Sequence, residues 1–168
     1  MTNVKLAYMD TSAITKRYVR ERGSDQIDKL YRVAEQGKIT LTYSVWNIGE
    51  VLGVLDKQRT RGYLTNQQYD TAISIYFGEN EKLIRLNSLG IVPITSTILV
   101  ESWRIIQEQH IYAADAIQIA SADQTGSSLF LTADKRLAEA AFNHGLEAVN
   151  VEEENNIEEK IERLGKGS

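Results

Sequence analysis

The chain has 168 residues, of which 42% are apolar and 25% charged, so we expect one compact domain rather than a disordered chain. It contains no cysteine and only two histidines, which excludes a disulfide scaffold, thiol catalysis and the common zinc motifs. The net charge is −4, although residues 1–90 carry 13 Lys/Arg against 10 Asp/Glu. Nucleic acid would therefore have to bind at a local patch, helped by cations. Since no apolar run suits a membrane span or a secretory signal, we expect a cytoplasmic protein with no membrane partner.

The first half of the chain predicts strands that alternate with helices. Short apolar or β-branched runs predict strands at 4–9, 38–43 and 91–94, the last holding the only proline. Helices are expected at 13–19, 24–36, 44–62 and 65–87. Ser12, Ser44 and Thr65 are the expected N-caps, because a hydroxyl can accept a hydrogen bond from the first helical turn.

The second half continues the alternation at shorter spacing. It predicts helices at 96–109 and 113–124, a strand at 129–131, a helix from an Asp134 cap to 143, and a strand at 147–151. We therefore expect an α/β fold with one mostly parallel sheet covered on both faces. Residues 1–150 would form the domain. The acidic extension 151–168 would join it or be partly disordered, with one terminal helix and a frayed GKGS end.

Four carboxylates occupy positions that suggest a site. Asp10 and Asp134 each follow a predicted strand, and ligands of parallel sheets bind beyond the carboxyl ends of the strands. Glu50 and Asp115 lie on largely apolar helices, where a carboxylate is unfavourable unless it is paired, protonated or bound to a cation. Each also has a structural explanation: a helix cap for Asp10 and Asp134, an Arg partner for Glu50, and the helix dipole for Asp115.

Carboxylates that converge without His or Cys are typical of a site for Mg²⁺ or Mn²⁺, which prefer oxygen ligands. Without a cation, four neighbouring carboxylates would repel one another and raise one another's pKa. Such metal sites hydrolyse phosphodiesters. We therefore expect Asp10, Glu50, Asp115 and Asp134 to gather around one shared metal cluster.

These residues belong to segments that resemble the PIN-domain ribonucleases, and most closely the toxins of VapBC toxin–antitoxin pairs. The segments are MDTSAITKRYV, SVWNIGEVLGVL, YAADAIQIASA and LFLTADKRLAEAA, and the likeness runs from about residue 6 to 149. The resemblance implies a three-layer α/β/α fold and Mg²⁺- or Mn²⁺-dependent cleavage of single-stranded or loop RNA. It also implies that Asp10, Glu50, Asp115 and Asp134 are the catalytic, metal-binding quartet.

The resemblance further implies that Ser12 and Thr132 lie beside the metal centre, that a small antitoxin binds in a nearby groove, and that the protein forms a homodimer. Lys16, in a basic stretch after Asp10, is expected to contact the RNA backbone together with these hydroxyls. Residues 44–87 should form an antiparallel helical hairpin beside the site. Its outer apolar residues, including Ile73, Ile75 and Tyr76, make it a candidate partner surface.

Two other motifs share part of the segment after the first predicted strand but do not fit it. The Asp-Thr-Ser segment lacks the second Asp of haloacid-dehalogenase-type phosphatases, because position 12 is Ser, and it fails the D-x-S-x-S adhesion motif, because position 14 is Ile. The glycine-rich nucleotide-binding loops are absent from the sequence. Two alternatives stay open: a non-catalytic PIN-like module that binds RNA or protein, and a PIN nuclease of RNA processing that has no antitoxin.

Overall fold

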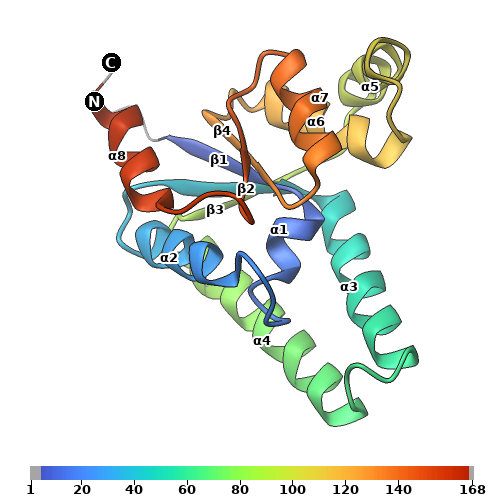
Figure 1. Cartoon of the computed structure of the whole chain (residues 1–168), viewed down its shortest axis with the longest axis vertical. Coiled ribbons are helices and arrows are strands. Elements are labelled where there is room, and N and C mark those ends of the chain that lie inside the picture. Colours follow the sequence, from blue (N-terminus) through green and yellow to red (C-terminus); the bar gives the residue numbers. More distant parts are fainter. Residues whose placement is uncertain (1–4, 167–168) are drawn as a thin grey trace.

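A five-stranded parallel sheet forms the centre of the computed structural model, which describes residues 5–166 (Figure 1). The strands are β1 (Leu6–Met9), β2 (Thr40–Ser44), β3 (Leu89–Val92), β4 (Leu129–Thr132) and β5 (Ala148–Asn150). Their order is β3-β2-β1-β4-β5, and every neighbouring pair is parallel. The predicted parallel α/β architecture is confirmed. Residue 4 of the expected first strand and residues 167–168 of the expected frayed end lie outside the described residues.

Helices cover both faces of this sheet. They are α1 (Thr11–Thr15), α2 (Ser24–Glu35), α3 (Val45–Thr60), α4 (Asn66–Arg85), α5 (Ser96–Gln109), α6 (Ala113–Gln124), α7 (Lys135–Asn143) and α8 (Ile157–Lys166). In Figure 1, α1, α2, α3 and α4 lie below the sheet, and α5, α6 and α7 lie above it. The result is the expected three-layer α/β/α fold.

The core is built around the central strands. Ala7, Tyr8 and Met9 of β1 are fully buried, and the Tyr8 ring stacks on Phe130 of β4 with ring centroids 5.6 Å apart. A strand that is apolar on both sides suits a parallel sheet sandwiched between helices. Ile157 and Ile161 of α8 belong to the same hydrophobic cluster, and α8 packs against α2. The division of the chain at residue 150 stays a prediction.

Two predicted boundaries are wrong. The first helix is shorter than expected and ends at Thr15, and its N-cap is Asp10 instead of Ser12. Asp10 accepts a hydrogen bond from the backbone N–H of Ala13, whereas the Ser12 hydroxyl is used to bind Asp10 itself. The third strand ends at Val92, before Pro93, because proline cannot donate to a sheet ladder.

The helices α3 and α4 form an arm at the bottom of Figure 1, joined by residues 61–65 and diverging from that joint. The predicted capping box at Thr65 is present, with Thr65 and Gln68 each accepting a hydrogen bond from the other's backbone N–H. Tyr76 was expected on the outer face, but it is fully buried. Ile75 is exposed and Ile73 half-buried, and Phe77 and Ile84 of α4 are exposed as well.

Within residues 5–166, none of the helices is both long enough and apolar enough to span a lipid bilayer.

Candidate metal-dependent nuclease site

An acidic cavity of 630 Å³ lies at the carboxyl ends of β1 and β4. Asp10 reaches it from the end of β1, Glu50 from α3, Asp115 from the first turn of α6, and Asp134 from the N-cap of α7. The four carboxylates singled out in the sequence therefore line one cavity, although they come from four different elements. Parallel strand topology explains this arrangement, since it brings the carboxyl ends of the strands to one edge.

Asp10 is the most deeply buried of the four, with 4% of its surface exposed. Its carboxylate accepts hydrogen bonds from the hydroxyls of Ser12 (2.7 and 2.9 Å) and Thr132 (2.9 Å) and from the backbone N–H of Ala13 (2.8 Å). Burial raises the pKa of Asp10 to about 7 despite these hydrogen bonds, which lower it, and the charge of Asp115 adds to the rise. Asp10 is thus held in one orientation in a site that favours a neutral acid unless a cation binds.

Glu50 is oriented by a network that begins on its own helix. The Thr11 hydroxyl donates to Glu50 Oε2 at 2.6 Å, and the side-chain amide of Gln118 donates to the same oxygen at 3.2 Å. Asn47, fully buried one turn before Glu50, donates to Thr11 Oγ1 and Gln118 Oε1. The Oδ1 atom of Asn47 accepts from the Tyr8 hydroxyl at 2.8 Å. This network connects β1, α1, α3 and α6 around the carboxylate.

Asp115 and Asp134 lie on the more open side of the cavity. Burial raises the pKa of Asp115 to about 6, the charges of Asp134 and Glu50 raise it further, and Arg136 opposes them. Asp134 Oδ1 accepts from the backbone N–H groups of Arg136 and Leu137. Asp134 therefore also caps α7, as its position before the predicted helix suggested. A capping role and a role in the site are therefore compatible for this residue.

Lys16 lines the same cavity, yet only 2% of its surface is exposed. Its ammonium donates to Glu21 at 3.1 Å and to Glu152 at 2.6 Å. Lys16 therefore neutralises two carboxylates of the protein instead of offering a free cation to phosphate.

The hydroxyls of Ser12 and Thr132 likewise donate to Asp10. The substrate-binding roles of Ser12, Lys16 and Thr132 stay predictions, and the structure shows their polar atoms engaged within the protein.

Two arginines that follow Lys16 are also paired. Arg17 forms ion pairs with Asp28 (2.7 Å) and Glu79 (2.6 Å), and Arg20 forms ion pairs with Asp25 and Asp28. Arg17 thus connects α2 to α4, and Arg20 contacts α2.

The sequence predicts no role for Thr11, Asn47, Gln118, Glu21 or Glu152. Asn47 precedes Glu50 by three residues and Gln118 follows Asp115 by three, so each shares a helix face with a candidate acid. The sequence signal that could have identified Asn47 and Gln118 is a side-chain amide one turn from an acid on a largely apolar helix. No sequence pattern indicates Glu152, which reaches Lys16 across 136 residues.

The donor chemistry of the cavity fits Mg²⁺ or Mn²⁺, but the expected four-carboxylate cluster is not assembled. In the part of the chain that the structure describes, no three acidic or histidine side chains lie close enough together to hold one ion. The hydrogen bonds of Asp10, Glu50 and Asp134 explain the separation, because each carboxylate is oriented by its own donors. Mg²⁺ usually takes only one or two carboxylates and keeps several waters, and the cavity is compatible with that arrangement.

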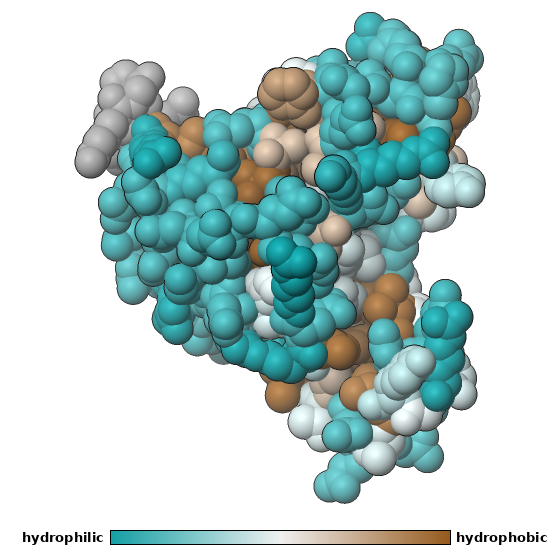
Figure 2. All heavy atoms as spheres, viewed as in Figure 1, coloured by the Kyte–Doolittle hydropathy of each residue, from teal (hydrophilic) through white to brown (hydrophobic). Residues whose placement is uncertain are grey.

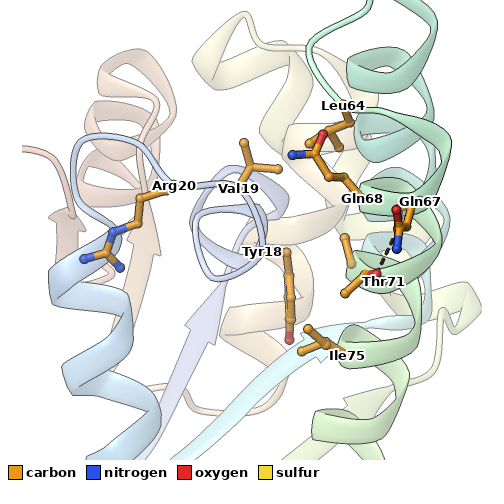
Figure 3. Close-up of a pocket in the computed structure, with 9 residues that line it drawn as sticks. Tyr18, Val19, Arg20, Leu64, Gln67, Gln68, Thr71 and Ile75 are labelled. Carbon is orange, nitrogen blue, oxygen red and sulfur yellow. Dashed lines mark hydrogen bonds between the residues drawn. The ribbon is translucent and has the colours of Figure 1, made fainter.

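A second groove of 490 Å³ opens between the α1–α2 connection and α4 (Figure 3). Tyr18 and Val19 line one side of it, and Leu64, Ala72 and Ile75 line the other. Figure 2 shows a mostly hydrophilic face on which apolar residues gather in the hollow between the α3–α4 arm and the rest of the molecule. This groove is the more apolar of the two large concavities, whereas the acidic cavity carries the titratable groups.

The fold and the acidic cavity agree with a comparison to protein-family models. The PIN domain model matches residues 7–143, which is most of the chain. The protein therefore belongs to the PIN domain family, as the sequence motifs predicted. A search of curated proteins found no match.

Several solved structures share this fold. PAE2754 from Pyrobaculum aerophilum is 19% identical, with 99% of each chain covered and a TM-score of 0.59. FitAcB from Neisseria gonorrhoeae is 16% identical, with 88% of this chain and 99% of that chain covered and a TM-score of 0.60. VapC20 from Mycobacterium tuberculosis, a sarcin–ricin loop cleaving toxin, is 14% identical, with 86% and 97% covered and a TM-score of 0.58. At these identities the likeness concerns the fold.

Proposed function

We propose that the protein is a metal-dependent endoribonuclease that hydrolyses RNA phosphodiester bonds at the acidic cavity. The observation that carries the proposal is that Asp10, Glu50, Asp115 and Asp134 line one cavity of a PIN domain from four separate elements. The raised pKa values of Asp10 and Asp115 support it, because burial and the charges of other acids disfavour ionised carboxylates that a bound cation would stabilise. VapC20, which shares the fold, is described as a toxin that cleaves RNA at the sarcin–ricin loop.

Asp10, Glu50, Asp115 and Asp134 are the residues that would hold Mg²⁺ or Mn²⁺. A bound ion would neutralise charge on the phosphoryl group and polarise it. The protein's own contribution is orientation: Ser12 and Thr132 hold the Asp10 carboxylate, while Thr11 and Gln118 hold that of Glu50. Carboxylates held in advance need little reorganisation when negative charge develops in the transition state.

The test compares purified wild type with Asp10→Asn on mixed RNA in Mg²⁺, in Mn²⁺ and in chelator. Wild type should cleave with either metal and stop in chelator, and Asp10→Asn should be slower by about 10²-fold or more. Asp70→Asn, which changes an exposed acid outside the cavity, is the matched control and should keep full activity. Equal cleavage by wild type and Asp10→Asn, or activity that survives chelation, would contradict the proposal and favour a non-catalytic binding module.

We further propose that the protein is the toxin of a type II pair, that a small antitoxin binds the groove of Figure 3, and that the toxin is a homodimer. The support is the shared fold with a toxin–antitoxin complex from Klebsiella pneumoniae, which is 18% identical and covers 86% of this chain and 97% of that chain with a TM-score of 0.53. The exposed Ile75 and the half-buried Leu64 give the groove an apolar floor for a peptide.

The test co-expresses the chain with the product of an adjacent small reading frame. A stable complex that suppresses cleavage would support the toxin role, and Ile75→Asp should weaken the complex while leaving nuclease activity intact. Light scattering on the isolated chain would test the dimer, for which the mass should be twice 18.9 kDa. Active nuclease with no such partner would favour the alternative of RNA processing without an antitoxin.

A further inference from the structure

A smaller cavity adjoins the acidic cavity and differs from it in chemistry. It has a volume of 120 Å³ and is lined by Ile111, Tyr112, Asp115, Asp134, Arg136 and Leu137. Asp115, Asp134 and Leu137 also line the acidic cavity. The two cavities therefore share a wall, and a ligand in the small cavity would lie beside the two open carboxylates.

Tyr112 is exposed to an unusual degree for an aromatic residue at this position. It is 80% exposed, the highest value among the large hydrophobic side chains in the described part of the chain. It occupies the N-cap position of α6, yet within residues 5–166 its side chain makes no capping hydrogen bond. The ring therefore contributes little to the fold, and an amphipathic ring left in water at the rim of a site suits contact with a ligand.

Arg136 supplies a positive charge in the same small cavity. Its Nη2 atom donates to the backbone carbonyl of His110 at 2.8 Å, which holds the guanidinium against the turn that precedes Tyr112. Asp10, Glu50, Asp115 and Asp134 repel a phosphate that approaches the acidic cavity, and Lys16 is already paired. Arg136 is therefore a cation at the edge of the site through which a polyanion can be held.

We propose that Tyr112 and Arg136 form a nucleotide subsite, in which the Tyr112 ring stacks on the base next to the scissile bond and Arg136 binds a neighbouring phosphate. The proposal rests on the proposed nuclease function and names its substrate class as unpaired RNA. Proteins recognise unpaired bases by stacking them on aromatic rings, and stacking tolerates any base. A base within a duplex cannot stack on a side chain without being unpaired, so the subsite selects single strands and loops.

The first experiment measures the affinity for a short fluorescent single-stranded RNA by anisotropy. It uses the Asp10→Asn protein with Mg²⁺, so that the readout does not depend on hydrolysis. Tyr112→Ala should weaken binding about tenfold, and Tyr112→Phe should bind within about twofold of the parent because the ring remains. Tyr63→Ala is the matched control: Tyr63 is 73% exposed and lines none of the three cavities among the described residues, so its removal should change nothing.

Arg136→Gln should weaken binding and reduce the slope of log affinity against log salt by about one. Oligonucleotides with one abasic position at successive places then locate the stacked base. At that position the abasic change and Tyr112→Ala should not add to each other, because both remove the same contact.

Equal affinity of the parent and Tyr112→Ala, or strict additivity at every abasic position, would overturn the subsite. A wild type that fails to cleave RNA but binds it through Tyr112 would overturn the nuclease function and leave the subsite standing. A wild type that cleaves RNA normally but binds it independently of Tyr112 would overturn the subsite and leave the nuclease function standing. Duplex RNA bound as tightly as single strands would contradict the selection for unpaired bases.

Discussion

The acidic cavity has two sides that are built in different ways. The buried side consists of Asp10, held by Ser12 and Thr132, and of the half-buried Glu50, which is joined by hydrogen bonds to Thr11 and through it to Asn47. The open side consists of Asp115 and Asp134 and continues into the small cavity with Tyr112 and Arg136, of which all but the half-buried Asp115 are exposed. Under the proposed function, the buried side would orient carboxylates in advance, and the open side would contact the ligand. Buried polar groups suit orientation because an unmade hydrogen bond is unfavourable there.

Removal of Asn47 should have the greatest effect on stability, because this side chain joins four elements of the buried side. Asn47→Ala removes the acceptor of the Tyr8 hydroxyl and the donor to Thr11 Oγ1 and Gln118 Oε1, and we expect the free energy of unfolding to fall by about 3 kcal/mol. Urea unfolding measures the change, with the exposed Asn66→Ala as control. A loss no larger than that of the control would mean that the network does not stabilise the buried side.

The pH dependence of stability without metal should reveal the raised pKa of Asp10. Between about pH 4 and pH 7 native Asp10 keeps a proton that the unfolded chain has lost, so stability should fall as the pH rises through this window. Asp115, whose pKa is about 6, contributes with the same sign.

In chelator near pH 8, Asp10→Asn should therefore be more stable than wild type by about 2 kcal/mol. Unfolding curves of both proteins across this range test the expectation. Parallel curves, or a wild type that gains stability as the pH rises, would contradict it.

Substitution of Lys16 distinguishes a structural role of this side chain from a role in substrate binding. Lys16→Met leaves Glu21 and Glu152 without their cation, and we expect the free energy of unfolding to fall by about 1.5 kcal/mol, since both partners are partly exposed. Lys82→Met, which removes an exposed partner of Glu35, should change it by less than about 0.5 kcal/mol. Unchanged stability together with weakened RNA binding would instead show that Lys16 contacts phosphate.

Asp134 belongs to the open side, and its loss should have the smallest effect on stability. Asp134→Ala removes the N-cap of α7 and should lower the free energy of unfolding by about 1 kcal/mol, whereas Asp134→Asn keeps a capping oxygen and should lower it less. Thermal unfolding of the two variants is the measurement. Equal losses would show that the capping oxygen retained in Asp134→Asn does not stabilise the helix.

Most element boundaries could be predicted because their signals are local. The helices Ser96–Gln109 and Ala113–Gln124 have the predicted bounds, and the capping box at Thr65 starts α4 where expected. The first helix could not be predicted correctly, because Ser12 has a capping side chain and the right position but donates to Asp10 instead. Local propensity cannot show whether Asp10 or Ser12 will be the N-cap, because the hydrogen bond from Thr132 to Asp10 joins segments that are distant in the sequence.

The amino-acid sequence by itself determined that Asp10, Glu50, Asp115 and Asp134 would line one cavity, because the order of strands and helices imposes a parallel sheet with its carboxyl ends at one edge. Only the tertiary structure decided how each carboxylate is held, since Thr11, Asn47 and Gln118 contact one another across three different helices. It also decided that Lys16 pairs with Glu152, a residue 136 positions away. Periodicity and capping act over a few residues, whereas hydrogen bonds and ion pairs between distant segments depend on side-chain positions that form only when the layers pack.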